Sequence, residues 1–294
     1  MKPDLIKALI FGVNGQDGFY LSEILHREGI LVRGVSRSVG NWIVGNVNNF
    51  DFVAQLIEGY KPDFIFHLAA NSSTQHELLF ENYNTISTGT INILEACYKY
   101  SPKCKIFISG SGLQFVNNGN AISENDPFDT TSSYALARIQ SVYSARYFRS
   151  LGLKVYVGYF FNHDSPLRSE RHVNQKIAQS VKRIASGSTE VLELFDITIR
   201  KEFSFAGDIM EAVFIFVNNE TNYETVIGSG KAYSIEDWLS ICFGIYKIDW
   251  RARVKFLASS NSKTNLLVSN PTTMLNLGWQ QRQSIYDLAY MMVQ

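Results

Sequence analysis

The fold of this 294-residue chain is indicated most clearly by the stretch Gly12-Val13-Asn14-Gly15-Gln16-Asp17-Gly18. It follows an apolar run over residues 5–11, which predicts a buried strand, and precedes a run over residues 19–28, which predicts a helix. Glycines at the spacing GxxGxxG allow a tight turn and a close approach of the backbone to a pyrophosphate, and the helix N-terminus adds free N–H groups. The stretch therefore predicts a loop that binds the phosphates of a nucleotide, through Gly12, Asn14, Gly15, Gln16, Asp17 and Gly18.

Strands and helices alternate through the first two-thirds of the chain. Further strands are predicted over residues 31–36, 63–68, 105–109 and 154–160, and further helices over residues 50–59, 85–98 and 133–151. This alternation indicates βαβ units, and hence a parallel sheet covered on both faces. We expect an α/β fold with a doubly wound, Rossmann-type sheet in residues 1–164. We place a smaller substrate-binding region in residues 165–294, with one or more segments returning to the sheet.

The composition of the chain argues against nucleic acid, a membrane or a metal ion as a partner. The chain has 27 basic and 27 acidic residues, so it carries no net charge for binding nucleic acid or an anionic membrane. Its three cysteines form no CxxC pair, and its five histidines show no metal-ligand spacing. No apolar run approaches the ~20 residues of a spanning helix. We expect a cytoplasmic protein without a metal, nucleic-acid or membrane partner.

The end of the second predicted strand bears on the choice of cofactor. An acid usually stands there in NAD sites, where it holds the ribose 2′-OH. This chain has Ser36-Arg37-Ser38 instead. A guanidinium with neighbouring hydroxyls suits a 2′-phosphate. Ser36 and Arg37 therefore favour NADP(H), and NAD(H) remains the alternative.

Several motifs follow in a characteristic order. They are the run KPDFIFHLAA at residues 61–70, the helix with Tyr134, Asn162-His163-Asp164-Ser165-Pro166, Phe205-Ala206-Gly207-Asp208 and Leu277-Gly278-Trp279. Over essentially its whole length the chain resembles the extended short-chain dehydrogenase/reductase superfamily, also called the NAD-dependent epimerase/dehydratase superfamily. Within it, the chain is similar to GDP-mannose 4,6-dehydratases and GDP-4-keto-6-deoxymannose reductases.

The resemblance implies further site residues. It places Leu68, Ala69 and Ala70 beside the ribose and diphosphate of the cofactor, and Asn46 and Val47 beside its adenine. Asn162 is expected near the substrate phosphate or the nicotinamide. The remaining substrate contacts implied are Val173 and Lys176 at the base, and Lys201 and Lys263 near the positions of two phosphate-binding arginines.

The catalytic positions depart from the superfamily pattern. Its members use a tyrosine and a lysine four residues later, a spacing that puts both on one helix face, where the cation favours the phenolate. Here Tyr134 is followed by Arg138. The family hydroxyl falls on Gly110, and the glutamate of dehydratases falls on Gly112. Ser111, or Ser109, can supply a hydroxyl if the loop shifts by one residue.

Three functions remain open. The first is an NAD(P)-dependent oxidoreductase that acts on a nucleotide-activated sugar at hexose C4, with Tyr134, Arg138 and Ser111 as its catalytic residues, and with both Tyr134 and Arg138 also touching the cofactor. The second is a lyase of the GDP-mannose 4,6-dehydratase type. The third is a cofactor-binding protein without catalysis. The resemblance also implies a homodimer formed through the Tyr134 helix.

Overall fold

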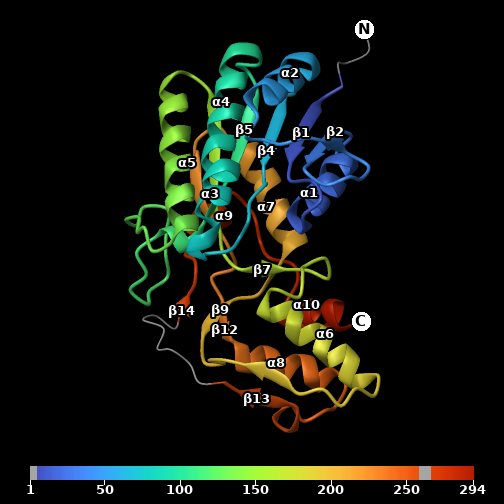
Figure 1. Cartoon of the computed structure of the whole chain (residues 1–294). Coiled ribbons are helices and arrows are strands. Elements are labelled where there is room, and N and C mark those ends of the chain that lie inside the picture. The colour runs from blue at the N-terminus through green and yellow to red at the C-terminus, as the bar shows by residue number, and fades with distance from the viewer. Residues whose placement is uncertain (1–4, 258–265) are drawn as a thin grey trace.

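A seven-stranded parallel sheet forms the centre of the molecule in the computed structural model, which describes residues 5–257 and 266–294. Its strand order is β11-β6-β5-β4-β1-β2-β3. Figure 1 labels β5, β4, β1 and β2 of this sheet. These strands are β1 (Lys7–Phe11), β2 (Leu31–Ser36), β3 (Ile43–Val44), β4 (Phe64–His67), β5 (Lys105–Ser111), β6 (Lys154–Phe160) and β11 (Glu224–Ile227). The predicted α/β fold with a Rossmann-type sheet is confirmed.

Helices cover both faces of this sheet. They are α1 (Gln16–Arg27) and α7 (Ala206–Val217) on one face, and α2 (Phe50–Tyr60), α4 (Gly89–Tyr100) and α5 (Ser133–Ser150) on the other. In β1, Ala8 and Ile10 pack toward α1 and α7, whereas Leu9 and Phe11 pack toward the opposite layer. Because both faces are buried, every position of such a strand favours an apolar residue, which explains the continuous runs in the sequence.

The predicted boundaries are close to those observed, with three informative differences. Helix α1 begins at Gln16, because Gly15 in extended conformation serves as its N-cap. The helix predicted from residue 85 is α4, which begins at Gly89 after the π-helical segment Tyr83–Thr88 and the short α3 (Leu79–Asn82). Strand β5 extends to Ser111, two residues beyond its predicted end. This extension carries Gly110 and Ser111 on a strand instead of a loop.

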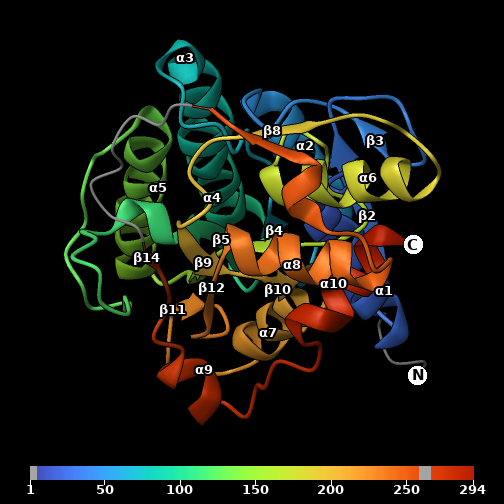
Figure 2. The same ribbon diagram turned by 90° about the horizontal axis from the view of Figure 1, so that it is seen from below.

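Much of the C-terminal part packs around a second core that contains Trp238, whereas Met274 and Trp279 pack against the main sheet. Its helices are α6 (Val173–Ala185), α8 (Ile235–Ile245), α9 (Thr272–Asn276) and α10 (Ile285–Val293), and its strands are β7 (His163–Asp164), β8 (Leu192–Leu194), β9 (Arg200–Glu202), β10 (Ser204–Phe205), β12 (Ala232–Ser234), β13 (Val254–Phe256) and β14 (Leu266–Leu267). Figure 2 shows α8 and α10 side by side in this part. Helix α7 and strand β11 lie in the layers of the main sheet, although they follow residue 164. Among the helices that the structure describes, none is both long and apolar enough to span a bilayer.

Candidate active site

The predicted phosphate loop joins β1 to α1 and fits a diphosphate. Gly12 has φ +95°, and a Cβ there would lie 2.6 Å from the backbone nitrogen of Ala69. A Cβ on Gly18 would collide with the carbonyl oxygen of Gly12. Gly15 caps α1 without any side-chain hydrogen bond, so the first N–H groups of the helix remain available to a phosphate. The loop thus has the close backbone packing and the helix N-terminus that a dinucleotide needs.

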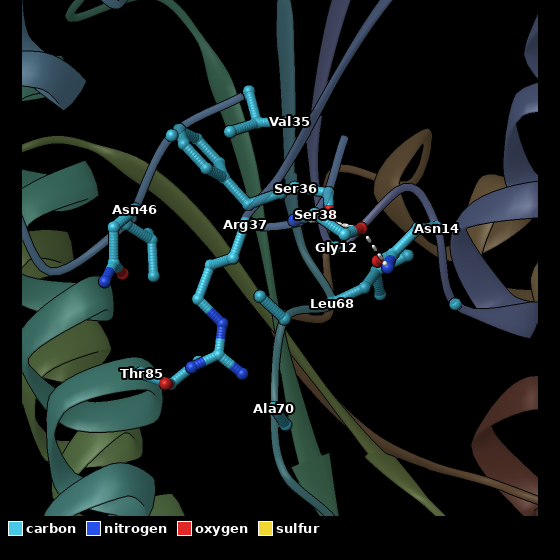
Figure 3. A pocket seen from close by; sticks show the side chains of 15 residues that line it. Gly12, Asn14, Val35, Ser36, Arg37, Ser38, Asn46, Leu68, Ala70 and Thr85 are labelled. Atoms are coloured by element: carbon cyan, nitrogen blue, oxygen red, sulfur yellow. Dashed lines mark hydrogen bonds between the residues drawn. The ribbon is translucent and has the colours of Figure 1, made fainter. Parts of the chain in front are cut away.

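One part of the cleft gathers the residues predicted for the adenosine end of a cofactor. Figure 3 shows Arg37, Asn46, Leu68 and Ala70 around it. The Arg37 guanidinium donates to Glu81 of α3 at 3.1 Å, and both side chains are partly exposed. The hydroxyls of Ser36 and Ser38 lie 3.2 Å apart. Also at this cavity are Gly12, Asn14, Gly15, Val35, Val47, Ala69 and Thr85.

The cleft continues toward the catalytic positions. Gly12, Gly15, Leu68 and Ala70 line both parts, so the two form one groove across the C-terminal ends of β1, β4, β5 and β6. The second part brings together the predicted residues Gln16, Asp17, Gly18, Ser111, Tyr134, Arg138 and Asn162. It also contains residues to which the sequence analysis assigned no site role, namely Ser72, Leu113, Phe161, His163, Arg168, His172 and Leu267.

Tyr134 and Arg138 are held by the start of α5. The Ser132 hydroxyl caps this helix by accepting a hydrogen bond from the Ala135 N–H at 3.1 Å. Arg138 is buried, and its guanidinium carbon lies 5.1 Å from the centroid of the Tyr134 ring. Its Nη1 donates to the carbonyl of Ser109 and, at 2.8 Å, to the Ser109 hydroxyl. Arg138 therefore presents its charge to the tyrosine ring while it is anchored to β5.

His67 lies close enough to Arg138 for the arginine charge to act on it. His67 is fully buried in β4, as expected for a packed core residue, and its Nε2 lies 3.1 Å from the Thr85 carbonyl. Burial, followed by the charge of Arg138, lowers the pKa of His67 to about 3. His67 is thus neutral at physiological pH, and it adds no second positive charge beside the tyrosine.

Gly110 and Gly112, two positions where the sequence differs from the superfamily pattern, are tightly enclosed by aromatic rings. A Cβ on Gly110 would lie 2.5 Å from the ring of Tyr159, and a Cβ on Gly112 would lie 2.8 Å from the ring of Phe161. Ser111 lines the same part of the cleft as Tyr134 and Arg138. Its hydroxyl accepts from the Leu113 N–H at 3.2 Å, and its own N–H donates to Gln114 at 2.9 Å. The hydroxyl proton of Ser111 therefore remains available for a substrate oxygen.

The next carboxylate along the chain does not replace the missing glutamate. Glu124 accepts from the Thr273 hydroxyl and from the Val226 N–H, and it is not among the residues that line the cleft. The cleft therefore has a tyrosine, an arginine and a serine hydroxyl at its catalytic end, but no carboxylate at the dehydratase position.

A basic group lies at the far wall of the cleft. Arg168 Nη2 is 3.3 Å from His172 Nδ1, and Arg168 Nε is 3.5 Å from an Asp164 oxygen. Burial, followed by the charge of Arg168, lowers the pKa of His172 to about 4. Lys201 is close enough to contribute to this shift, and burial lowers its own pKa. Arg168 and His172 follow directly after the Asn162–Pro166 motif, and the basic run RSERH was the signal that sequence reasoning missed.

Other predicted substrate residues lie outside the described cleft lining. Lys176 donates to the Glu193 carbonyl at 2.8 Å, and Val173 packs against the Trp238 core at the start of α6. Lys201 lies on β9, with its ammonium 5.5 Å from the Phe203 ring centroid. Lys263 falls outside the described residues.

A family model described as GDP-mannose 4,6 dehydratase matches residues 9–292. The chain belongs to this family. GDP-mannose 4,6 dehydratase 1 of Arabidopsis thaliana is 27% identical, with 100% of this chain and 90% of the relative covered. The human GDP-mannose 4,6 dehydratase is 25% identical, with 80% of this chain and 71% of the relative covered. The resemblance expected from the motifs is confirmed.

Solved structures share the fold at lower identity. UDP-glucose 4-epimerase of Thermus thermophilus, in complex with NAD, has a TM-score of 0.85 at 18% identity, with 98% of each chain covered. RMD from Pseudomonas aeruginosa, complexed with NADPH, has a TM-score of 0.85 at 16% identity, with 98% of this chain and 96% of that chain covered. This member of the GDP-mannose 4,6 dehydratase family therefore has the fold of nucleotide-sugar enzymes with a nicotinamide cofactor.

Proposed function

We propose that the chain is an NAD(P)-dependent oxidoreductase that interconverts an alcohol and a ketone at C4 of a nucleotide-linked hexose, without dehydration. The strongest support is that the cleft has a tyrosine and an arginine at two of the catalytic positions implied by the resemblance and glycines at the other two. Tyr134 and Arg138 stand where the groove reaches β5, whereas Gly110 and Gly112 are closed by Tyr159 and Phe161. The chain has a group suited to proton exchange and has no carboxylate at the position where the resemblance places the base of dehydratases.

Tyr134, Arg138 and Ser111 each have a separate role in the proposed reaction. A bound nicotinamide cofactor supplies or accepts the hydride. The Tyr134 hydroxyl gives a proton to the sugar oxygen during reduction and takes it back during oxidation. Arg138, whose guanidinium lies beside the Tyr134 ring, is proposed to interact with the negative charge that develops on the tyrosine during proton transfer. The Ser111 hydroxyl donates a hydrogen bond to the same sugar oxygen and polarises it.

The other residues of the cleft are assigned to parts of the cofactor and of the substrate according to their charge and hydrogen-bonding groups. Arg37 with Ser36 is proposed to hold a 2′-phosphate, so that NADP(H) binds more tightly than NAD(H). Arg168, with Lys201 nearby, is suited to the phosphates of a nucleotide sugar. Asn162 lines this part of the cleft and keeps its proposed substrate role. The roles proposed for Val173, Lys176 and Lys263 are supported by the family resemblance alone. Residues 1–164, together with α7 and β11, form the cofactor domain in this proposal, and most of residues 165–294 form the substrate region.

Self-association is proposed through α4 and α5, which stand side by side at one edge of the molecule (Figure 1). These helices expose large apolar or aromatic side chains, at Ile91, Tyr98, Leu136, Tyr143 and Tyr147. Such a patch commonly marks a protein interface. The proposed assembly is a homodimer that pairs these helices.

A GDP-mannose 4,6-dehydratase is the second candidate, because the family match and the names of the relatives favour it. Dehydration requires a base that removes the C5 proton while water leaves C6. General-base catalysis contributes about 10²–10⁴-fold. Without a carboxylate at Gly112, this reaction would need a base that the cleft does not supply from that position.

The decisive experiment compares the parent with Tyr134→Phe. A panel of 4-keto nucleotide sugars is incubated with NADPH, and the corresponding alcohols with NADP, while cofactor absorbance is followed. Tyr134→Phe is expected to lower turnover by about 10²–10⁴-fold, because the proton donor is lost. Its affinity for NADPH should stay close to that of the parent.

The remaining outcomes separate the candidates. Equal rates for the parent and Tyr134→Phe would refute the assignment of the tyrosine. Rapid conversion of GDP-mannose to a 4-keto-6-deoxy product would establish the dehydratase instead. A parent that binds NADPH tightly but turns over none of these sugars would favour the cofactor-binding protein without catalysis.

A further inference from the structure

His163 lies between two oxygen acceptors at the wall of the cleft. Its Nε2 is 2.9 Å from an Asp17 carboxylate oxygen, and its Nδ1 is 2.8 Å from the Phe161 carbonyl oxygen. A neutral imidazole carries only one N–H and can donate to only one of these oxygens. The doubly protonated ring satisfies both contacts. The geometry thus favours an imidazolium paired with the Asp17 carboxylate.

A second set of contacts joins the same two segments. Gln16 Nε2 donates to the His163 carbonyl at 3.3 Å, and the Ser165 hydroxyl donates to Gln16 Oε1 at 3.0 Å. Asp17 and His163 are 146 positions apart in the chain. The phosphate loop at the start of α1 is therefore fastened by side chains to the segment that carries Phe161 and Asn162.

The electrostatics of the pair agree with this geometry. The His163 and Asp17 side chains are 8% and 22% exposed. Burial opposes the charge on His163, but the Asp17 carboxylate outweighs it and raises the histidine pKa above 6.5. Burial also opposes the charge on Asp17, but His163, with help from Arg168, lowers its pKa below 3.8. The charged groups acting on His163 are Asp17 from α1 and Arg168 from the segment after β7.

We propose that Asp17 and His163 are positioning residues, whose ion pair holds the phosphate loop against the catalytic wall of the cleft and thereby supports binding of the cofactor. This proposal rests on the proposed function for its ligand, a nicotinamide dinucleotide, but the ion pair is a property of the chain itself. The pair should persist at neutral pH. It should be lost as the pH rises through the raised pKa of His163, or falls through the lowered pKa of Asp17.

The first measurement is an NMR titration of the parent labelled with ¹⁵N-histidine, with the His163 signals assigned by comparison with His163→Gln. Both ring nitrogens should remain protonated to a pH above the ordinary pKa of 6.5, because the Asp17 carboxylate favours the charged ring. In Asp17→Asn, the same ring should lose its proton at lower pH. A His163 ring that titrates at or below 6.5 in the parent would overturn the ion pair, whatever the protein binds.

The second measurement is the dissociation constant for NADPH and for NADH between pH 6 and pH 9. For the parent it should rise by up to about tenfold per pH unit once His163 begins to lose its proton. Asp17→Asn should weaken binding at neutral pH by about tenfold or more and flatten the pH profile. His26→Gln, an exposed histidine on the same helix, should match the parent.

These two measurements separate the possible failures. If Asp17→Asn has the same affinity and pH profile as the parent, the positioning role is wrong. If the parent binds neither NADPH nor NADH, the proposed function fails, and the NMR titration still decides the ion pair.

Discussion

Gly110 and Gly112 stand where the resemblance places a hydroxyl and a glutamate, and neighbouring aromatic rings occupy the space that a side chain there would need. The Tyr159 ring lies where a Cβ of residue 110 would go, and its hydroxyl donates to Glu224 at 2.6 Å. Glu224 in turn accepts from Arg146 and Arg149. A residue larger than glycine at position 110 would have to displace a ring that is fixed at both ends.

Gly112→Glu is therefore expected not to create a dehydratase. Its side chain would press on the buried Phe161 ring, and overpacking of this kind costs about 1–3 kcal/mol. The free energy of unfolding, measured with urea, should fall by that amount, and GDP-mannose should yield no 4-keto-6-deoxy product. Gly59→Glu is the matched control, because Gly59 is exposed on α2 with open space around it. A stable Gly112→Glu variant that forms the product would contradict this account.

Arg37 carries the prediction about cofactor choice. Arg37→Ala should weaken NADPH binding by roughly 1.5–3 kcal/mol, the scale of hydrogen bonds to a charged group. NADH binding should hardly change, because it has no 2′-phosphate. Isothermal titration calorimetry of both cofactors measures this difference. Arg27→Ala, which removes an arginine paired with Glu211 outside the cleft, is the control. Equal affinities for NADPH and NADH in the parent would rule out the preference.

At the level of elements, the start of α5 sets the position of Tyr134. Ser132→Ala removes the hydroxyl that caps the helix two residues before the tyrosine, and loss of such a cap costs about 0.5–2 kcal/mol. We expect a lower melting temperature, and a lower kcat because the first turn of α5 frays. Ser234→Ala, at the cap of the distant helix α8, should lower stability to a similar extent and leave kcat unchanged. A fall in kcat for Ser234→Ala as large as that for Ser132→Ala would show that the effect is not local.

Some elements can be predicted from the sequence, whereas contacts between distant elements cannot. Strands such as β4 are recognisable because all of their residues are buried and three of the four are apolar. The phosphate loop is recognisable because its glycines meet a backbone requirement at fixed spacing. The contacts of Asp17 with His163, and of Gly112 with Phe161, depend on how distant segments pack, and no local pattern in the chain specifies them. Most of the residues missed in the cleft belong to this second class, whereas Arg168 and His172 lie in the basic run RSERH and have a local signal.

At the level of the whole molecule, two cores are joined by a chain that crosses between them. After β6 the chain forms β7 and α6 in the C-terminal part, and then returns through α7 and β11 to the main sheet. Asn162 and His163, which line the cleft, lie at the first of these crossings. The cleft is thus lined both by residues of the main sheet and by residues that follow it, such as Arg168 and His172, so residues far apart in the sequence meet there.

The last prediction concerns the exposed aromatic face of α4 and α5. Tyr147 on α5 is 60% exposed, and Tyr98 on the neighbouring helix α4 is also exposed. If these helices pair with those of a second copy, Tyr147→Glu would bury a carboxylate on each side of the interface, which is strongly unfavourable. Sedimentation should give the mass of a dimer for the parent and of a monomer for Tyr147→Glu. Tyr290→Glu, on α10 and 53% exposed, is the matched control and should remain a dimer. Because Tyr134 stands on the same helix as Tyr147, kcat of the monomer should also fall. A parent that sediments as a monomer would refute the proposed homodimer.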